Sequence, residues 1–398
     1  MNYSRFLGGA VLLGLIALAG CGDDPDGDLV TGPEDPQLSE ATEGLSADVS
    51  VLGKGYFGKG SGAVYTLSNA PSANSILRFQ VSGDGSLTPA GSYETGGAGT
   101  GVGLGSQGAL VKKGILLFAV NAGSNDISVL REHGSGLQQV SMVSSGGTMP
   151  ISLTVRGDIL YVLNAGGAGN ISGFRGARSG HLRPIPGSTR PLSGVGVAPA
   201  QIQFSPASRI LVVTEKATNK ILTYKVGFDG RAGSPFVQNS VGDTPFGFDF
   251  TRRGHLVVSD AYGGNPLQSA LSSYRIARNG MLNLVTGPVA NMQTAACWVV
   301  ISPDGRFAYT TNTGTNNISG YRIGHDGGLT LFNDGGNTAP SDAGPIDAAL
   351  SRSSRTLYCL NAGGNSITSY RRDLRSGTLS PLGSVTGLPV GAAGLAAN

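Results

Sequence analysis

Two sets of side chains could carry chemistry, and each set recurs at an equivalent point of a repeated unit. The first set lies where one strand of each unit ends: five units have Asn there, and two have the carboxylates Glu215 and Asp260. Asn suits such a point, because it tolerates left-handed backbone and its side chain caps turns. Glu does neither well, and Glu215 precedes Lys216, the one acidic–basic pair in these loops. An adjacent carboxylate and cation are suited to acid–base chemistry.

The second set lies near the start of another strand of each unit. Aligning these strands on their last apolar residue gives one equivalent position occupied by dissimilar residues. They are Gln107, Ser152, Gln201, Gly247, Trp298 and Asp347, with Ala392 nearby from the last strand. A position that only supports a fold would tend toward one residue type. A ring that varies while staying mostly polar or aromatic is therefore a candidate for ligand contact, to which Phe246 would add an apolar wall.

A repeat must position both sets. Three close copies of one phrase are Tyr161–Asn164, Tyr309–Asn312 and Tyr358–Asn361, and four looser copies are Val64–Asn69, Phe118–Asn121, Val212–Glu215 and Val257–Asp260. The last residues of successive copies lie about 45 to 50 residues apart, which is room for four short strands per unit. Helical repeats are excluded, because the segments alternate with period two or are β-branched runs. Seven copies predict an all-β, seven-bladed β-propeller with four-stranded blades.

The chain ends indicate how such a ring would close. The first unit has no convincing first strand before Val64, while residues 389–395 read as a first strand with no second strand after it. The C-terminal strand is therefore predicted to complete blade one. In each blade the first strand starts, and the second ends, on the same face, so both sets of candidate residues are expected around one channel mouth.

The repeats resemble those of the seven-bladed lactonase family, which includes bacterial 6-phosphogluconolactonase-type propellers. The resemblance rests on Tyr-Val-Leu-Asn and on Ile-Ser-x-Tyr-Arg followed by Asp-Gly-x-Leu-Thr, and it covers roughly residues 60–398. It implies hydrolysis of a lactone, which needs a base, a group that polarises the carbonyl and a wall beside the ring. Glu215 or Asp347 would be the base, and Lys216 or Gln201 the polarising group.

Trp298 with Phe246 would form the wall, and Gln107, Gln201 and Asp260 would add substrate contacts. Members of the family often have His or Arg where the first strand starts, whereas this chain has Gln, Ser, Trp and Asp there. That departure disfavours a sugar phosphate as substrate. A non-catalytic propeller that binds a protein or glycan partner is the alternative function.

The N-terminal segment has the features of export. Arg5, an apolar run over 6–18 and the tetrapeptide Leu-Ala-Gly-Cys ending at Cys21 predict a signal peptide over 1–21 with a lipobox, cleavage before Cys21 and lipid attachment to its thiol. Gly22 after the cysteine favours the outer membrane, so a lipid-anchored protein of the bacterial cell envelope is expected. Residues 22–53 hold nine Asp and Glu and no Lys or Arg. Residues 22–55 are therefore predicted to be a flexible acidic linker before the propeller at 56–398.

Charge, cysteines and absent motifs limit the partners. From Lys54 onward there are 27 Lys and Arg against 16 Asp and Glu, a net charge of +11. This excess suits an anionic partner, an anionic envelope surface or a solubilising exterior. Cys297 and Cys359 lie in different repeats and are expected to remain separate buried thiols. No cofactor or zinc spacing is found, and calcium on Glu215, Asp260 and Asp347 stays an open alternative. A monomer without affinity for nucleic acid is expected.

Overall fold

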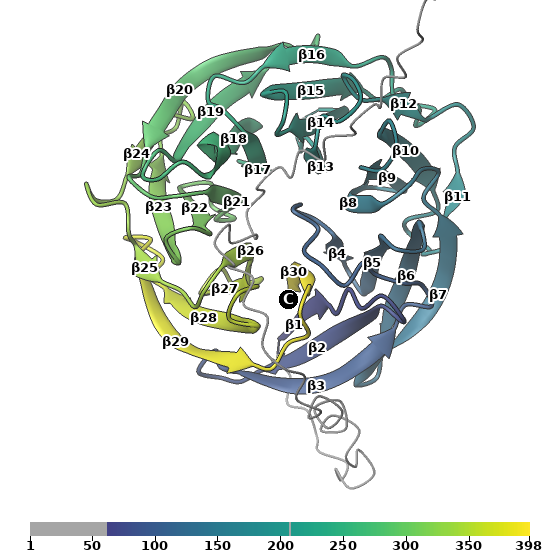
Figure 1. The fold of residues 1–398 in the computed structure, drawn as a ribbon, viewed down its shortest axis with the longest axis horizontal. Helices are drawn as coiled ribbons and strands as arrows, with labels where there is room; N and C mark the ends of the chain where they lie inside the picture. Colours follow the sequence, from purple (N-terminus) through teal and green to yellow (C-terminus); the bar gives the residue numbers. More distant parts are fainter. Residues whose placement is uncertain (1–61, 207) are drawn as a thin grey trace, which may run out of the picture.

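Seven small antiparallel sheets form a ring in the computed structural model, which describes residues 62–206 and 208–398 (Figure 1). The predicted signal peptide, Cys21 and the linker over 22–55 lie outside the described residues. Each sheet places its first strand nearest the ring axis and its last strand at the rim. The predicted seven-bladed β-propeller is confirmed. Within the described residues, no helix is long and apolar enough to cross a membrane.

The strands of the seven blades follow the chain in order. Blade 1 has β30 (Ala393–Ala397), β1 (Ala63–Leu67), β2 (Ser75–Val81) and β3 (Leu87–Glu94), and blade 2 has β4 (Leu110–Lys113), β5 (Leu116–Asn121), β6 (Asp126–His133) and β7 (Gly136–Ser144). Blade 3 has β8 (Pro150–Arg156), β9 (Ile159–Asn164), β10 (Asn170–Arg175) and a rim strand in two pieces, β11 (Arg183–Pro184) and β12 (Arg190–Pro191). Blade 4 has β13 (Pro199–Phe204), β14 (Ile210–Glu215), β15 (Lys220–Lys225) and β16 (Phe236–Asn239).

The remaining blades repeat this plan. Blade 5 has β17 (Pro245–Phe250), β18 (His255–Asp260), β19 (Ala270–Ile276) and β20 (Leu282–Ala290), with a short 3-10 turn, η2 (Tyr262–Gly264), between β18 and β19. Blade 6 has β21 (Ala296–Ile301), β22 (Phe307–Asn312), β23 (Asn317–Ile323) and a rim strand in two pieces, β24 (Leu329–Leu331) and β25 (Ala339–Pro340). Blade 7 has β26 (Pro345–Leu350), β27 (Thr356–Asn361), β28 (Ser366–Arg372) and β29 (Leu379–Thr386).

Burial follows the position of a strand within its blade. Every residue of β5, β14, β18 and β22, the second strands of four blades, is buried, because both faces of the sheet pack against neighbouring blades. The rim strands β3, β7 and β20 are largely exposed. Apolar runs therefore occupy the second strands. Apolar and polar residues alternate only weakly there, because neither face of the strand meets water.

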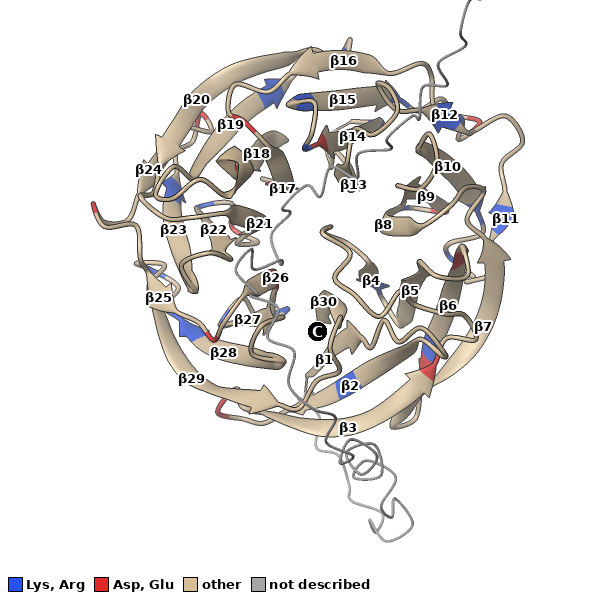
Figure 2. Ribbon diagram, in the orientation of Figure 1, with Lys and Arg blue, Asp and Glu red and all other residues tan. Residues whose placement is uncertain are grey.

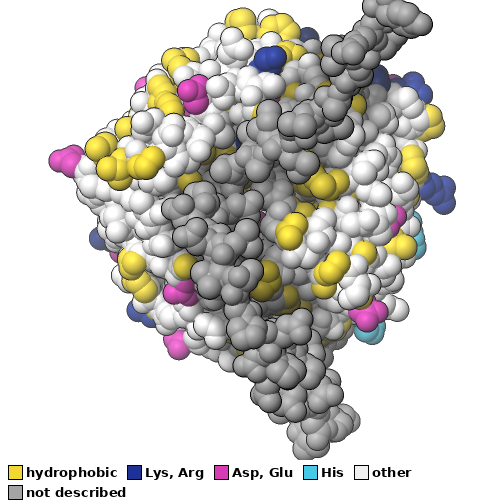
Figure 3. Space-filling view, viewed as in Figure 1, with side chains coloured by type: hydrophobic (Ala, Val, Ile, Leu, Met, Phe, Trp, Pro, Cys, Tyr) yellow, Lys and Arg dark blue, Asp and Glu magenta, His cyan; other side chains and the backbone are white. Residues whose placement is uncertain are grey.

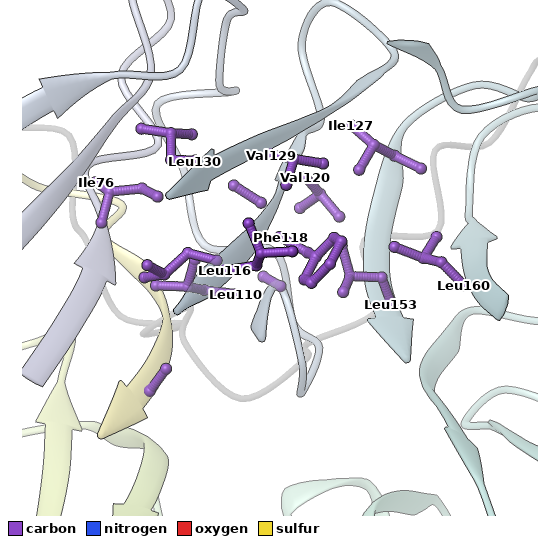
Figure 4. Close-up of a cluster of buried hydrophobic side chains, with 14 of the residues drawn as sticks. Ile76, Leu110, Leu116, Phe118, Val120, Ile127, Val129, Leu130, Leu153 and Leu160 are labelled. Carbon is purple, nitrogen blue, oxygen red and sulfur yellow. The ribbon is translucent and has the colours of Figure 1, made fainter. Parts of the chain in front are cut away.

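The core consists of clusters that lie between adjacent blades. One cluster joins blades 1, 2 and 3 and includes Ile76, Phe118 and Leu160, all fully buried (Figure 4). Burial of such side chains stabilises the fold by about 25 cal/mol per Å² of apolar surface. Since each cluster draws on neighbouring blades, no blade buries its own faces alone.

Ring closure joins the two ends of the described chain. The C-terminal β30 pairs with β1 in antiparallel fashion, and the amide of Asn398 donates to the carbonyl of Ala63 (3.0 Å). The prediction that blade 1 takes its innermost strand from the C-terminus is confirmed. Cys297 and Cys359 are both buried and Cys359 is a free thiol, so no disulfide joins these two residues.

Deletion of residues 393–398 is expected to remove β30 and expose the inner edge of β1. The loss of a buried strand should lower the free energy of unfolding by several kcal/mol, at about 25 cal/mol per Å² of apolar surface. Thermal unfolding followed by circular dichroism measures the change. Deletion of residues 22–53 is the control and should leave the melting temperature nearly unchanged. Equal melting temperatures for the two truncations would contradict closure by the C-terminal strand.

Candidate functional site at the channel mouth

The side chains at the ends of the second strands form hydrogen bonds that join the blades. Asn312, at the end of β22, is completely buried, and its amide donates to Asn317 (2.7 Å) and Ser319 (2.8 Å) at the start of the next strand. Its oxygen accepts from Asn291 (2.9 Å), which lies just after the rim strand of the preceding blade. The hydroxyl of Ser319 thus has a structural role, because it accepts from the Asn that ends the preceding strand.

Glu215 occupies the same position in blade 4 and is completely buried. Its carboxylate accepts hydrogen bonds from the backbone N–H of Ser193 (2.9 Å), the hydroxyl of Ser193 and the hydroxyl of Thr218 (2.8 Å). The exposure of Glu215 to the channel, which the sequence pattern suggested, is not found. Ser193 explains the difference: it follows the rim strand of blade 3 and offers two donors, which a carboxylate satisfies better than an amide.

Asp260 is the equivalent residue of blade 5, and it is also completely buried. One oxygen accepts from the hydroxyl of Ser272 (2.5 Å), and the other has no hydrogen-bond partner. Burial raises the pKa of Asp260 to about 8. The carboxyl group is therefore largely protonated at neutral pH and contacts protein atoms on all sides, an arrangement that supports the blade and leaves no direct path to a substrate.

Polar residues of the second set also bond to backbone, but at the inner strands. The side-chain amide of Gln201 donates to the carbonyl of Phe248 (2.8 Å) and accepts from its N–H (2.7 Å), so it clamps β13 to β17. Asp347 accepts from the N–H of Ala348 (2.8 Å) and from that of Leu395 in β30. Burial raises the pKa of Asp347 to about 8, and backbone N–H groups of β26 and β30 already occupy this carboxyl.

Gln107 forms the same kind of clamp across the ring. It precedes β4 in blade 2, yet its amide donates to the carbonyl of Val299 in blade 6 (2.7 Å) and accepts from the N–H of Val299 (3.1 Å). Gly247 leaves the space for this contact, because a Cβ at that position would lie 2.4 Å from Oε1 of Gln107. The variable ring position is thus explained in large part by contacts with backbone on other blades.

The segment 103–108 extends from blade 2 into the channel and bonds to blades 3, 4 and 6. Its carbonyl and side-chain groups bond to several blades: the hydroxyl of Ser106 donates to Ile151 (2.7 Å), the indole N–H of Trp298 donates to Ser106 (3.0 Å), and Ser152 donates to Gln107 (2.6 Å). We call residues 103–108 the channel plug. The sequence pattern singled out Gln107 in this stretch, but nothing in the residue types indicated that it bonds to blades across the ring.

Lys216, Phe246 and Trp298 come together at the channel plug. The rings of Phe246 and Trp298 lie 4.9 Å apart between centroids, both buried, and Nζ of Lys216 lies 4.5 Å from the centre of the Phe246 ring. The same Nζ donates to the carbonyl of Gly105 in the plug (2.8 Å). Burial lowers the pKa of Lys216 to about 8. Lys216 as a whole is half-buried, and its amine is the buried end of the side chain.

The predicted residues therefore separate into two groups. Gln107, Lys216, Phe246 and Trp298 gather around the channel plug, and Lys216 is the one predicted catalytic residue that contacts the plug. Glu215 and Asp260 lie in the junctions between blades, and Gln201 and Asp347 hold inner strands together. A lysine with a pKa near neutrality, packed on an aromatic ring, is suited to proton transfer.

Carboxylates that were considered as calcium ligands lie in three different blades. Glu215 belongs to blade 4, Asp260 to blade 5 and Asp347 to blade 7. In the part of the chain that the structure describes, no three His, Cys, Asp or Glu side chains come together in a way that could hold a metal ion.

Exposed apolar side chains surround this face of the ring. Val102, Val195 and Val390 are 64%, 78% and 74% exposed, and each lies in a connection from one blade's rim to the next blade's first strand. Figure 3 shows scattered hydrophobic side chains on one face of the ring and few Lys or Arg away from its edge. Sequence patterns do not reveal this property, because the three valines belong to connections that have little repeat character.

Replacement of Asp260 by Asn should stabilise the protein above neutral pH. The folded pKa of about 8 exceeds the ordinary value of 3.8, so the native state binds more protons than the unfolded state between these values. Stability from Asp260 is present at low pH and is lost as pH rises toward 8. Asn stands at this point in four other blades and carries no charge, so Asp260→Asn should add about 1 kcal/mol at pH 9.

Urea unfolding at pH 5, 7 and 9 measures the effect. Asp334→Asn is the control, because Asp334 is exposed and has the same change of charge. Two results would contradict a buried, protonated Asp260. One is an Asp260→Asn variant no more stable than the parent at pH 9, and the other is an equal change in the free energy of unfolding for Asp260→Asn and Asp334→Asn.

Comparison with known proteins gives one family and several similar structures. A family model described as "Lactonase, 7-bladed beta-propeller" matches residues 261–393, which is less than half of the chain. A curated relative, the 6-phosphogluconolactonase of Pectobacterium carotovorum subsp. carotovorum (strain PC1), is 24% identical over 198 residues. That match covers 48% of this chain and 57% of the relative, so it spans less than two thirds of the relative's length.

Two solved structures are similar over nearly their whole length. A protein from Lactobacillus plantarum has a TM-score of 0.69 at 19% identity, covering 85% of this chain and 99% of its own. The periplasmic gluconolactonase of Pseudomonas aeruginosa has a TM-score of 0.66 at 20% identity, covering 83% of this chain and 98% of its own. At such identities the similarity establishes the seven-bladed fold and leaves the reaction to be argued from the site.

Proposed function

We propose that this protein hydrolyses a small lactone at the channel plug, with Lys216 as the general base. The observation that carries the proposal is the position of Lys216, whose amine lies beside Phe246 and Gly105 with a pKa lowered to about 8 by burial. The partial match to the lactonase family and the names of the similar proteins support lactone hydrolysis as the reaction.

The reaction follows from the neutral form of the Lys216 amine. The amine takes a proton from water as the water oxygen adds to the carbonyl carbon of the lactone. The tetrahedral intermediate collapses, the ring C–O bond breaks, and the ammonium returns the proton to the leaving alkoxide. The product is a hydroxy acid. Phe246 and the plug carbonyl of Gly105 fix the amine before substrate binds, so little reorganisation is needed.

The exposed side chains on the face of the ring that holds Lys216 favour a lactone with an apolar substituent. Exposed valines such as Val195 and Val390 lie in the connections on this face. Carboxylates such as Asp243 and Asp342 also lie in these connections, which disfavours an anionic substrate. A neutral alkyl-substituted lactone therefore fits better than a sugar phosphate.

Substitutions of Lys216 test the role of its amine. Lys216→Arg keeps the positive charge but cannot give up its proton, and Lys216→Met keeps the length of the chain without a basic group. Both should lower kcat/KM at least about a hundredfold on alkyl-substituted lactones, since general-base catalysis is worth 10²–10⁴. Proton release from a panel of lactones measures the rates. Lys220→Met, a lysine in the same blade, is the control and should keep activity.

The pH dependence distinguishes a base from a polarising cation. If the neutral amine acts, kcat/KM of the parent rises with pH and levels off above about 8, the pKa of Lys216. Retained activity in Lys216→Arg, or a kcat/KM that falls above pH 8, would contradict the role of Lys216 as the general base. Absence of turnover on every lactone would favour the alternative, a non-catalytic propeller that binds a protein or glycan.

We further propose that Cys21 carries a lipid that tethers the propeller to the bacterial envelope, at the outer membrane. The support is the Leu-Ala-Gly-Cys sequence after an apolar run. Cys21→Ser should move the protein from the membrane fraction to the soluble fraction without changing its melting temperature. Fractionation and the mass of the mature N-terminus measure this. A membrane-bound variant, or a mature N-terminus at another residue, would show that the lipidation proposal is wrong.

A further inference from the structure

Ring closure leaves a groove on the face opposite the channel plug. Six blades have a turn between their first and second strands on this face, whereas blade 1 has the chain end Asn398 beside Gly62. A groove of about 1550 Å³ lies between blades 7, 1 and 2, bordered by the turns at 351–355 and 112–115. We call it the closure groove. It follows from the absence of a turn in blade 1.

Four of the six cations that line the closure groove form no side-chain hydrogen bond or ion pair. Arg352, Arg355, Arg371 and Arg375 line it, and all four are exposed. Among the described residues, their guanidinium groups form no hydrogen bond and no ion pair. Like charges that converge in this way repel one another, and an anion between them would relieve the repulsion.

The carboxylates near the groove already have partners. Asp84 accepts from the N–H (2.9 Å) and hydroxyl (2.7 Å) of Ser86, and Asp373 accepts from the N–H of Arg375 (2.9 Å) and of Ser376 (2.7 Å). Glu132 pairs with Lys112 (3.0 Å) and accepts from Tyr65. These three carboxylates line the groove together with six Lys and Arg side chains, so the lining has an excess of positive charge.

The face that holds the closure groove has other basic residues, but they surround a smaller cavity. A second, smaller cavity of about 520 Å³ between blades 4, 5 and 6 is lined by Arg253, Arg275 and Arg278. In Figure 2 most basic segments lie toward the outer strands, for example on β2, β23 and β28. The closure groove differs from this general excess because it combines four unpaired guanidinium groups with a large concave volume.

We propose that the closure groove binds a ligand with several phosphate-type groups. Arginine is the side chain that pairs with phosphate in a bidentate manner, and four such groups around one concavity suit more than one anionic group. The turns at 351–355 and 373–378 hold two or more of these arginines on short, hydrogen-bonded backbone. The site is separate from the channel plug, so it does not depend on lactone hydrolysis.

Calorimetric titration of the full chain with tripolyphosphate, at low salt, tests the site. The double variant Arg352→Glu/Arg371→Glu reverses two groove charges, and Arg178→Glu/Arg183→Glu reverses two exposed charges in blade 3. The groove variant should bind at least about tenfold more weakly than the parent, equivalent to about 1.4 kcal/mol. The control should change less than about twofold, and orthophosphate should bind more weakly than tripolyphosphate.

The two double variants change the net charge by the same amount. If both bound tripolyphosphate equally weakly, net charge alone would explain the binding, and the proposal would be overturned. Absence of saturable tripolyphosphate binding by the parent would also overturn it. Melting temperatures check that the variants are folded. Sedimentation with vesicles that contain phosphatidylglycerol, compared with vesicles of phosphatidylcholine alone, identifies the source of the phosphate groups. If less of the groove variant than of the control sediments with the vesicles, the ligand is a lipid headgroup. If equal amounts sediment while the parent binds tripolyphosphate, the ligand is a soluble polyphosphorylated molecule. Every variant keeps the same N-terminal segment, so differences report the groove.

Discussion

Buried hydrogen bonds between neighbouring blades are the interaction on which the ring depends. Each second strand ends in a polar side chain without solvent exposure, such as Asn121, Asn164 or Asn361. Removing one partner would strand the others in the core, at about 1–3 kcal/mol for each unsatisfied group. Apolar packing drives the blades together, but it is tolerant of small rotations. These directional bonds fix the angle between one blade and the next, and so they set where the channel-facing residues lie.

That requirement limits which residues are available for chemistry. A carboxylate at a blade junction is held by the same donors that an Asn would use elsewhere, as the contacts of Glu215 with Ser193 and Thr218 demonstrate. Inner-strand residues such as Gln201 are committed to backbone in the same way. Lys216 is not part of these junction hydrogen bonds, because it lies one residue beyond the end of β14, where its side chain contacts the channel plug. Function at this mouth is thus confined to residues just outside the junction network.

The sequence predicted the ring well and the site less well, for physical reasons. The phrase that ends the second strand recurs seven times, and ring closure follows from a missing first strand before Val64, so local patterns determine both. The direction of a side chain depends on distant donors instead. Ser193 lies 22 positions from Glu215, and Gln107 meets Val299 across the ring. Residue type and alternation carry no information on such partners. Trp298 and Phe246 were placed together correctly, because β17 and β21 are adjacent first strands and Phe246 is next to Gly247, the equivalent of Trp298.

The contact of Gln107 with Val299 also changes how the ring can come apart. In a propeller whose blades touch only their neighbours, stability is a sum of local terms, and opening at one junction need not disturb the far side. Gln107 joins blade 2 to blade 6, and the indole of Trp298 adds a second bond between the same two blades. These bonds act as a strut across the circle. Separating blade 1 from blade 7 therefore does not free a linear array, since half the ring is still tied to the other half through the centre. Opening of the ring at one blade junction is therefore restrained by the bonds between blades 2 and 6 as well as by that junction.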